Sequence, residues 1–192
     1  MDHRFNATLR ACLIGVLLLP LMVRADVIFS ATDATWKLFK GLSEASSPDP
    51  AAWRQPTFDD TSWAVAPAPF YYTSTPTEPP FYNGGPVTGT VLGDMMNVYT
   101  CVFLRKTFVV TNAAASGTVM VQVAGDDGFI VWLNGVEVGR TNMPAGFVAY
   151  NGRALGSIAE PVQIHEFILS GSQWLREGTN VLTVQGFNWD PA

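Results

Sequence analysis

Two adjacent carboxylates, Asp126 and Asp127, have the type and setting that a bound cation needs. Glycine stands on both sides of the pair, which indicates a tight turn. Oxygen-rich loops of this kind bind Ca²⁺, which takes roughly 6 to 8 oxygen ligands. The same carboxylates can instead accept hydrogen bonds from backbone amides and cap the turn. We favour capping, because the sequence identifies too few ligand oxygens, and Ca²⁺ at Asp126 and Asp127 is the alternative prediction.

Four aromatic residues in a proline-rich stretch have the chemistry to bind a sugar. The stretch spans about residues 64–98 and contains Tyr71, Tyr72, Phe81 and Tyr82. An aromatic ring offers an apolar face on which a sugar ring can stack, and a tyrosine adds a polar tip. A connection this long inside a compact domain is usually a functional loop or an unrecognised element. The competing interpretation, which we favour, is that these rings pin the loop to the core while some stay exposed.

The other polar residues do not combine into a catalytic set. Asp59 and Asp60 are adjacent in a turn and should point apart, whereas glycoside hydrolysis needs two carboxyls about 5–10 Å apart across one cleft. We expect them to cap backbone amides instead. His165 is the one histidine of the sequence beyond the N-terminal segment and has no cysteine close to it in sequence, which argues against zinc. A nucleophile elbow and a glycine-rich phosphate loop are also absent from the sequence. The sequence therefore predicts no enzyme.

The elements that position these residues are predicted to be short β-strands. Residues 129–133 are β-branched or apolar and aromatic, and too few for a helix, so they predict a central strand with a hairpin on each side. Asp126 to Gly128 is expected to close one hairpin. Asn134 and Gly135 are expected to close the other, because this pair tolerates the positive φ angles of a type I′ turn.

Six or more further strands follow from the same pattern. Segment 53–63 carries two tryptophans and a phenylalanine among polar residues, and predicts a single helical turn whose rings fold back on the core. Because the sequence shows short strand patterns and no long amphipathic helix, we expect an all-β chain that forms an antiparallel β-sandwich or jelly roll. The expected strands are 34–41, 100–110, 118–124, 128–133, 136–141, 163–169 and 180–187, with a short one at 88–92.

The chain ends and composition bear on its cellular location. Residues 1–25 combine basic residues, an apolar run and a small-residue cleavage site, which predicts a signal peptide followed by one domain at 26–192. The net charge of −5 argues against nucleic acid and anionic membrane as partners. We therefore expect a protein that is secreted or held at the cell surface, with no membrane attachment after signal cleavage. Cys12 leaves with the signal, and Cys101 is expected to be a small buried hydrophobe.

A family resemblance is carried by four segments, 53–63, 104–108, 125–139 and 177–184. Together they resemble galactose-binding-domain-like jelly rolls, as in the sugar-binding domain of β-galactosidase-type glycoside hydrolases and in accessory domains of large secreted bacterial proteins. Gly125 to Gly139 resembles their central hairpin, and Glu177 to Val184 the turn and strand near their end. Leu104 to Phe108 resembles the strand before the hairpin, and Trp53 to Trp63 the opening segment. The likeness covers nearly all of residues 34–188. The Asp126-Asp127 turn also resembles PA14-type domains, in which such a pair holds a calcium ion that grips a sugar.

The resemblance implies a non-catalytic module, because in those hydrolases the catalytic carboxylates belong to a separate barrel. Such domains commonly continue into one more strand, so we expect this chain to lack its last strand and to be the N-terminal part of a longer protein. The expected partners are carbohydrate or other domains of the same protein. The function alternatives are recognition of carbohydrate or a cell surface, a structural spacer without ligand, and, more distantly, an accessory domain of a glycoside hydrolase.

Overall fold

The structure, a computed structural model, describes residues 27–30, 36–72, 81–82, 85–86, 89–159 and 162–190. The predicted signal peptide at 1–25 lies outside these ranges. Within them, the chain forms no helix of the length and apolar character that crossing a membrane would require.

The described residues are nearly all strand, loop and turn, which confirms the predicted all-β sandwich. Each of the seven longer strands expected from sequence is present within one or two residues of its expected bounds, and the short strand expected at 88–92 is β6. The helical turn expected near Trp53 is a 3₁₀ helix, η1. The strands are β1 Trp36–Lys40, β2 Ala64–Ala66, β3 Phe70–Tyr71, β4 Phe81–Tyr82, β5 Gly85–Pro86, β6 Thr90–Val91, β7 Cys101–Val110, β8 Thr118–Ala124, β9 Gly128–Leu133, β10 Val136–Thr141, β11 Ile164–Ser170 and β12 Gly178–Phe187, and the 3₁₀ helices are η1 Ala52–Arg54, η2 Ala113–Ala115 and η3 Ser172–Trp174.

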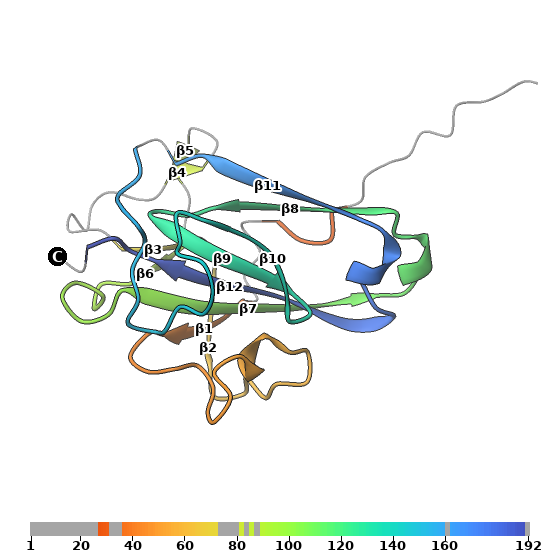
Figure 1. Ribbon diagram of the computed structural model, residues 1–192, viewed down its shortest axis with the longest axis horizontal. Helices are drawn as coiled ribbons and strands as arrows, with labels where there is room; N and C mark the ends of the chain where they lie inside the picture. The colour runs from red at the N-terminus through yellow and green to blue at the C-terminus, as the bar shows by residue number, and fades with distance from the viewer. Residues whose placement is uncertain are drawn as a thin grey trace, which may run out of the picture.

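Six antiparallel strands form the main sheet, in the order β10-β9-β12-β7-β1-β2 (Figure 1). The β9–β10 hairpin is closed by Asn134 and Gly135, whose φ angles of 53° and 84° are the positive values that its turn requires. The Asn134 side chain also donates to the carbonyl of Trp174 and to Asn180 Oδ1, and accepts from the Val181 amide. This residue therefore ties the hairpin to the start of β12.

The prediction of a second hairpin, on the N-terminal side of β9, is wrong. Asp126 to Gly128 does not join two paired strands, because β8 pairs with β11 in a separate two-stranded sheet, with Val121 opposite Phe167. Strand β9 pairs instead with β12, where Val131 lies opposite Val184. The Asp-Asp-Gly segment is thus a crossing from one layer of the sandwich to the other, and a tight crossing uses the same turn residues as a hairpin.

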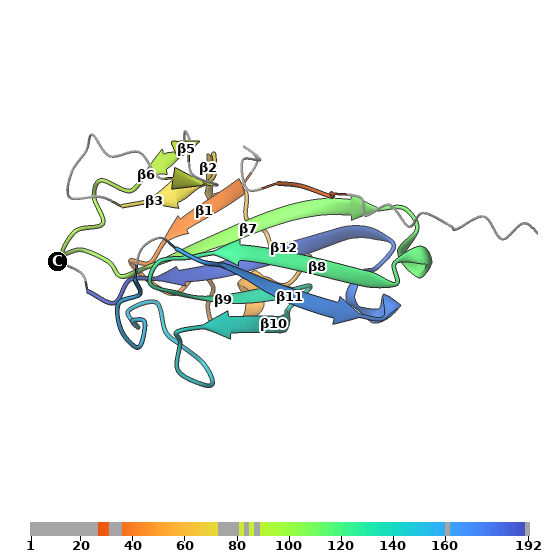
Figure 2. The same ribbon diagram turned by 90° about the horizontal axis from the view of Figure 1, so that it is seen from above.

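The two sheets enclose the larger apolar core. Figures 1 and 2 show β8 and β11 running side by side as their own layer beside the six-stranded sheet. Alternate residues of the facing strands meet between the layers, as the period of two in a β-strand requires. The buried members of this cluster include Trp36, Val121, Phe129, Val131, Leu133, Leu169, Leu182 and Val184.

The opposite face of the six-stranded sheet is covered by loops rather than by a second sheet. Segment 41–63, the orange to gold loop below β1 and β2 in Figure 1, lays Trp53 and Trp63 on this face. Segment 142–157 adds Met143 and Val148. As a result every residue of β9 is buried, which explains its unbroken apolar sequence. Cys101 is fully buried in the same cluster, as predicted, and its thiol donates to the Tyr150 carbonyl.

One buried cation holds segment 41–63 in place. Arg105 lies on the loop-covered face of β7 and is 1% exposed. Its Nε is 2.7 Å from Asp60 Oδ2, and its guanidinium also donates to the carbonyl oxygens of Trp53 and Gln55. Since an unpaired buried charge is costly, these acceptors and the cation depend on one another.

We predict that Arg105→Met lowers the free energy of unfolding by about 3 kcal/mol or more, because Asp60 and two carbonyl oxygens lose their donor. Asp60→Asn keeps the shape of the side chain and should cost less, about 1–3 kcal/mol. Arg153→Met is the matched control, since Arg153 is exposed and should change stability by less than about 0.5 kcal/mol. Urea unfolding measures all three, and an Arg105→Met protein as stable as the control would refute this role.

Candidate functional site

The structure places the two adjacent carboxylates in different surroundings. Asp126 is exposed, whereas Asp127 is partly buried. Asp127 Oδ1 accepts from the Ile158 amide at 3.2 Å, and Oδ2 accepts from the Trp189 amide at 2.6 Å. Asp127 therefore accepts from two backbone amides far from it in sequence, outside the turn whose amides the capping interpretation expected it to cap. No group of three or more His, Cys, Asp and Glu in the described ranges is placed to hold a metal, and the calcium site stays a prediction.

We predict that Asp127→Ala lowers the free energy of unfolding by about 1–3 kcal/mol, because two backbone amides lose a charged acceptor. Asp127→Asn, which keeps one acceptor oxygen, should fall between the alanine variant and the wild type. Thermal unfolding with excess CaCl₂ and with EDTA measures the effect, and capping predicts the same loss in both. Stabilisation of the wild type by Ca²⁺ that Asp127→Ala abolishes would instead establish a calcium site.

The structure describes the side chains of two of the four predicted sugar-stacking residues, Tyr71 and Tyr72. Tyr71 belongs to β3 and is partly exposed. Tyr72 packs against a third apolar cluster that includes Leu92 and Met95, which agrees with the pinning interpretation for this ring. Phe81 and Tyr82 form β4, and the surroundings of their side chains lie outside the described part of the structure.

The residues considered for catalysis have separate structural roles. Asp59 Oδ1 caps the Thr61 amide at 3.0 Å, while Asp60 pairs with Arg105, so the two carboxylates face different partners. Capping was the expectation for both, and the ion pair of Asp60 was not foreseen. His165 lies on the inner face of β11 and packs edge to face on Phe129, with their ring centroids 5.6 Å apart.

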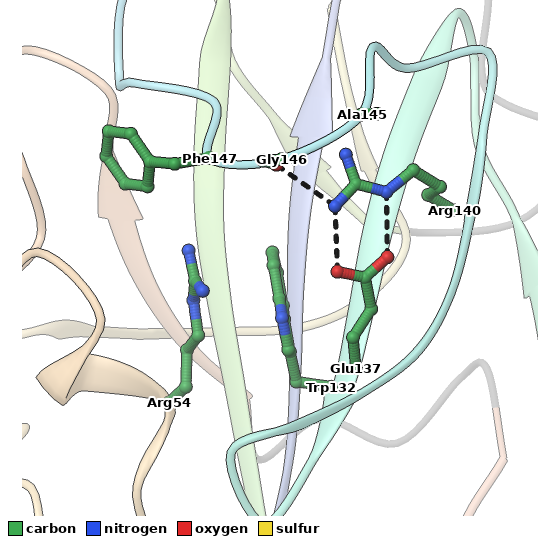
Figure 3. A pocket seen from close by; sticks show the side chains of 7 residues that line it. All are labelled: Arg54, Trp132, Glu137, Arg140, Ala145, Gly146 and Phe147. Atoms are coloured by element: carbon green, nitrogen blue, oxygen red, sulfur yellow. Dashed lines mark hydrogen bonds and ion pairs between the residues drawn. The ribbon is translucent and has the colours of Figure 1, made fainter.

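A pocket of about 450 Å³ opens over the loop-covered face of the main sheet. It is lined by one residue of η1, one of β9, two of β10 and a short loop: Arg54, Trp132, Glu137, Arg140, Ala145, Gly146 and Phe147 (Figure 3). The volume falls within the ~300–1,000 Å³ typical of small-ligand pockets. The sequence patterns assigned a site role to none of these residues.

A β-bulge in β10 places two charged residues on the same side of the strand. In a regular strand residues three apart face opposite sides, but the pairing register shifts between Glu137 and Gly139. Val138 packs on the inner core, and a Cβ on Gly139 would lie 2.2 Å from the Phe167 ring, so both face inward. The bulge therefore turns Glu137 and Arg140 together toward the pocket.

The donors of Arg140 are occupied within the protein. Its Nε and one terminal nitrogen each lie 2.7 Å from an oxygen of Glu137, a two-point ion pair drawn in Figure 3. The guanidinium also donates to the carbonyl oxygens of Pro144 and Gly146. The hydrogen bond from Arg140 lowers the pKa of Glu137, which keeps this carboxyl ionised at neutral pH. The pair is thus a fixed wall that also holds the loop at 144–147.

Arg54 lies across the pocket from Arg140 and, unlike it, is positioned by an aromatic ring. Its guanidinium carbon is 4.0 Å from the centroid of the Trp132 ring, the distance of a close cation–π contact. No hydrogen bond joins its buried Nε to any residue in the described ranges. Burial lowers the pKa of Arg54, an effect that Glu137 and Asp49 oppose and that Arg140 reinforces. Stacking on Trp132 and attraction to Glu137 and Asp49 hold this side chain in place.

Phe147 completes the rim of the pocket with an exposed aromatic ring. It is 55% exposed, and Figure 3 shows its ring on the Arg54 side of the pocket, directed away from the Glu137–Arg140 pair. Trp132, at the floor, is 3% exposed. The pocket therefore combines one accessible ring, one carboxylate and two guanidinium groups, a set that can hydrogen-bond to a polar ligand while one face of that ligand rests on carbon.

Comparison with known proteins gives a likeness of fold. No family model matches the chain, and no curated protein matches it in sequence. A calcium-binding mutant of β-glucuronidase 2 from Bacteroides uniformis is 17% identical, with a TM-score of 0.48 over 83% of this chain and 14% of its own. A glycosyl hydrolase family 2 member from Bacteroides cellulosilyticus is 14% identical, with a TM-score of 0.47 over 82% of this chain and 17% of its own.

The β-glucuronidase of Bifidobacterium dentium, solved with coumarin-3-O-glucuronide, is 22% identical, with a TM-score of 0.40 over 80% of this chain and 19% of its own. The chain thus spans 14% to 19% of the length of these proteins. At such identities and TM-scores the likeness carries no argument about this chain, and the site must be judged from its own residues.

Proposed function

We propose that this chain is a non-catalytic β-sandwich module that recognises carbohydrate through the pocket over Trp132. The observation that carries the proposal is an exposed aromatic ring, Phe147, beside a concave polar surface. Sugar ligands need both parts, since the C–H face of the ring packs on an aromatic group and the hydroxyls need donors and acceptors. The sequence expectation of export, from the predicted signal peptide, fits a module that meets glycans outside the cell.

The charged groups of the pocket support binding rather than hydrolysis. Glu137 is the one carboxylate among the described residues that line it, and the ion pair with Arg140 keeps it from serving as a proton donor at neutral pH. Hydrolysis by the usual route needs a second carboxyl across the cleft. The module would therefore act as an accessory part of a longer exported protein, and a structural spacer without ligand is the competing proposal.

A glycan array probed with the purified full chain tests this function. We expect bound glycans, and we expect Phe147→Ala to weaken their binding about tenfold, because a ring contact of about 1.4 kcal/mol is lost. Trp189→Ala is the matched control, because Trp189 is an exposed ring that does not line the pocket. It should bind like the wild type.

Two results would count against the proposal. Binding that Tyr71→Ala abolishes and Phe147→Ala leaves intact would move the site to the proline-rich loop. A blank array at high protein concentration would leave the spacer function in its place.

A further inference from the structure

The pocket carries an excess of positive charge in a chain that is acidic overall. Its lining residues contain two guanidinium groups and one carboxylate, whereas the whole chain has a net charge of −5. Glu137 neutralises Arg140 through the two-point ion pair. The remaining charge of the lining residues belongs to Arg54, which Asp49 and Glu44 also attract from outside the lining.

The Nε of Arg54 is buried and has no hydrogen-bond acceptor in the described ranges. A guanidinium has five N–H donors, and desolvating one without an acceptor removes hydrogen bonds that water would supply. Burial already lowers the pKa of Arg54, and the nearby Arg140 cation adds to this effect, although Glu137 opposes it. An anion in the pocket would offset both the lost hydration and the repulsion between the two cations.

The orientation of Arg54 leaves the N–H edge of its guanidinium available to a planar acceptor group of a ligand. One face of the guanidinium is occupied by Trp132, at 4.0 Å from the ring centroid. In Figure 3 the group stands beside the indole with its end directed toward the open space below Phe147. The two N–H groups at such an edge match the two oxygens of a carboxylate, the geometry in which arginine surpasses lysine.

The other wall of the pocket would set the direction of the bound sugar. The ionised carboxylate of Glu137 repels a second carboxylate and accepts hydrogen bonds from hydroxyl groups. A ligand with an acidic group at one end and hydroxyls at the other therefore fits with its acidic end at Arg54. Phe147 lies on the Arg54 side, where it can cover the ring that carries the acid.

We infer that the pocket selects saccharides that carry a carboxylate, such as uronic acid residues, and that Arg54 is the residue that binds the carboxylate. The inference rests on the proposed carbohydrate function and narrows it from sugars in general to acidic ones. Arg140 and Glu137 act as a fixed wall, and Phe147 supplies the apolar contact.

The test is to measure affinity for the bound glycans of the array and for their carboxyl-reduced forms, in which each uronic acid has become the neutral sugar. We expect carboxylate-bearing glycans among the strongest ligands, with at least tenfold weaker binding after carboxyl reduction. Arg54→Gln should cause a similar loss with an unchanged melting temperature, and Arg54→Lys an intermediate one. Arg153→Gln removes an exposed arginine outside the pocket and is the control.

The outcomes separate the inference from the function that it narrows. Tight binding of neutral glycans that depends on Phe147 but not on Arg54 would overturn the acidic specificity and leave carbohydrate recognition standing. Preference for sulfated over carboxylated glycans would overturn the carboxylate assignment alone. The absence of any bound glycan would overturn both.

Discussion

The need to bury the main sheet on both faces governs this structure. Strand β9 has no exposed side, because Phe129, Val131 and Leu133 face one layer while Ile130 and Trp132 face the other. Strands β8 and β11 cover the first face, but the second is covered by irregular segments. Loops on a sheet must satisfy their own backbone groups, and here Arg105 donates to the carbonyl oxygens of one such segment.

The pocket follows from that arrangement. Two loops that cover one sheet meet imperfectly, and the gap between η1 and the loop at 144–147 lies over Trp132. In a regular strand Glu137 and Arg140 would face opposite sides, but the bulge in β10 turns both toward the gap. Their ion pair forms one fixed wall of the pocket. The buried Nε of Arg54 has no hydrogen-bond acceptor in the described ranges, and the guanidinium stacks on Trp132, which is why we expect a ligand with an acceptor group here.

Local patterns predicted the strands well, because Gly, Asn and Asp at both ends of a β-branched or aromatic run mark where the strand begins and ends. The Asn134-Gly135 turn is such a case. The crossing at Asp126 to Gly128 was mistaken for a hairpin, because its turn residues are local whereas the partner of β9 is β12, more than forty residues later. The Arg105–Asp60 pair, separated by 45 residues, left no local trace either. The candidate site was not predicted from the sequence for the same reason. Arg54 and Trp132 come into contact only in the folded chain, and the sequence pattern of β10 does not reveal its bulge.

The location of the bound sugar is the central question, and backbone and indole NMR spectra answer it most directly. A ¹⁵N-labelled chain titrated with a glycan from the array should show its largest shift changes at the Trp132 indole N–H and at the amides of Ala145, Gly146 and Phe147, which surround the pocket. Changes confined to Tyr71 and Tyr72, or to the Asp127 and Trp189 region, with the pocket signals unmoved, would contradict the assignment of function to this site.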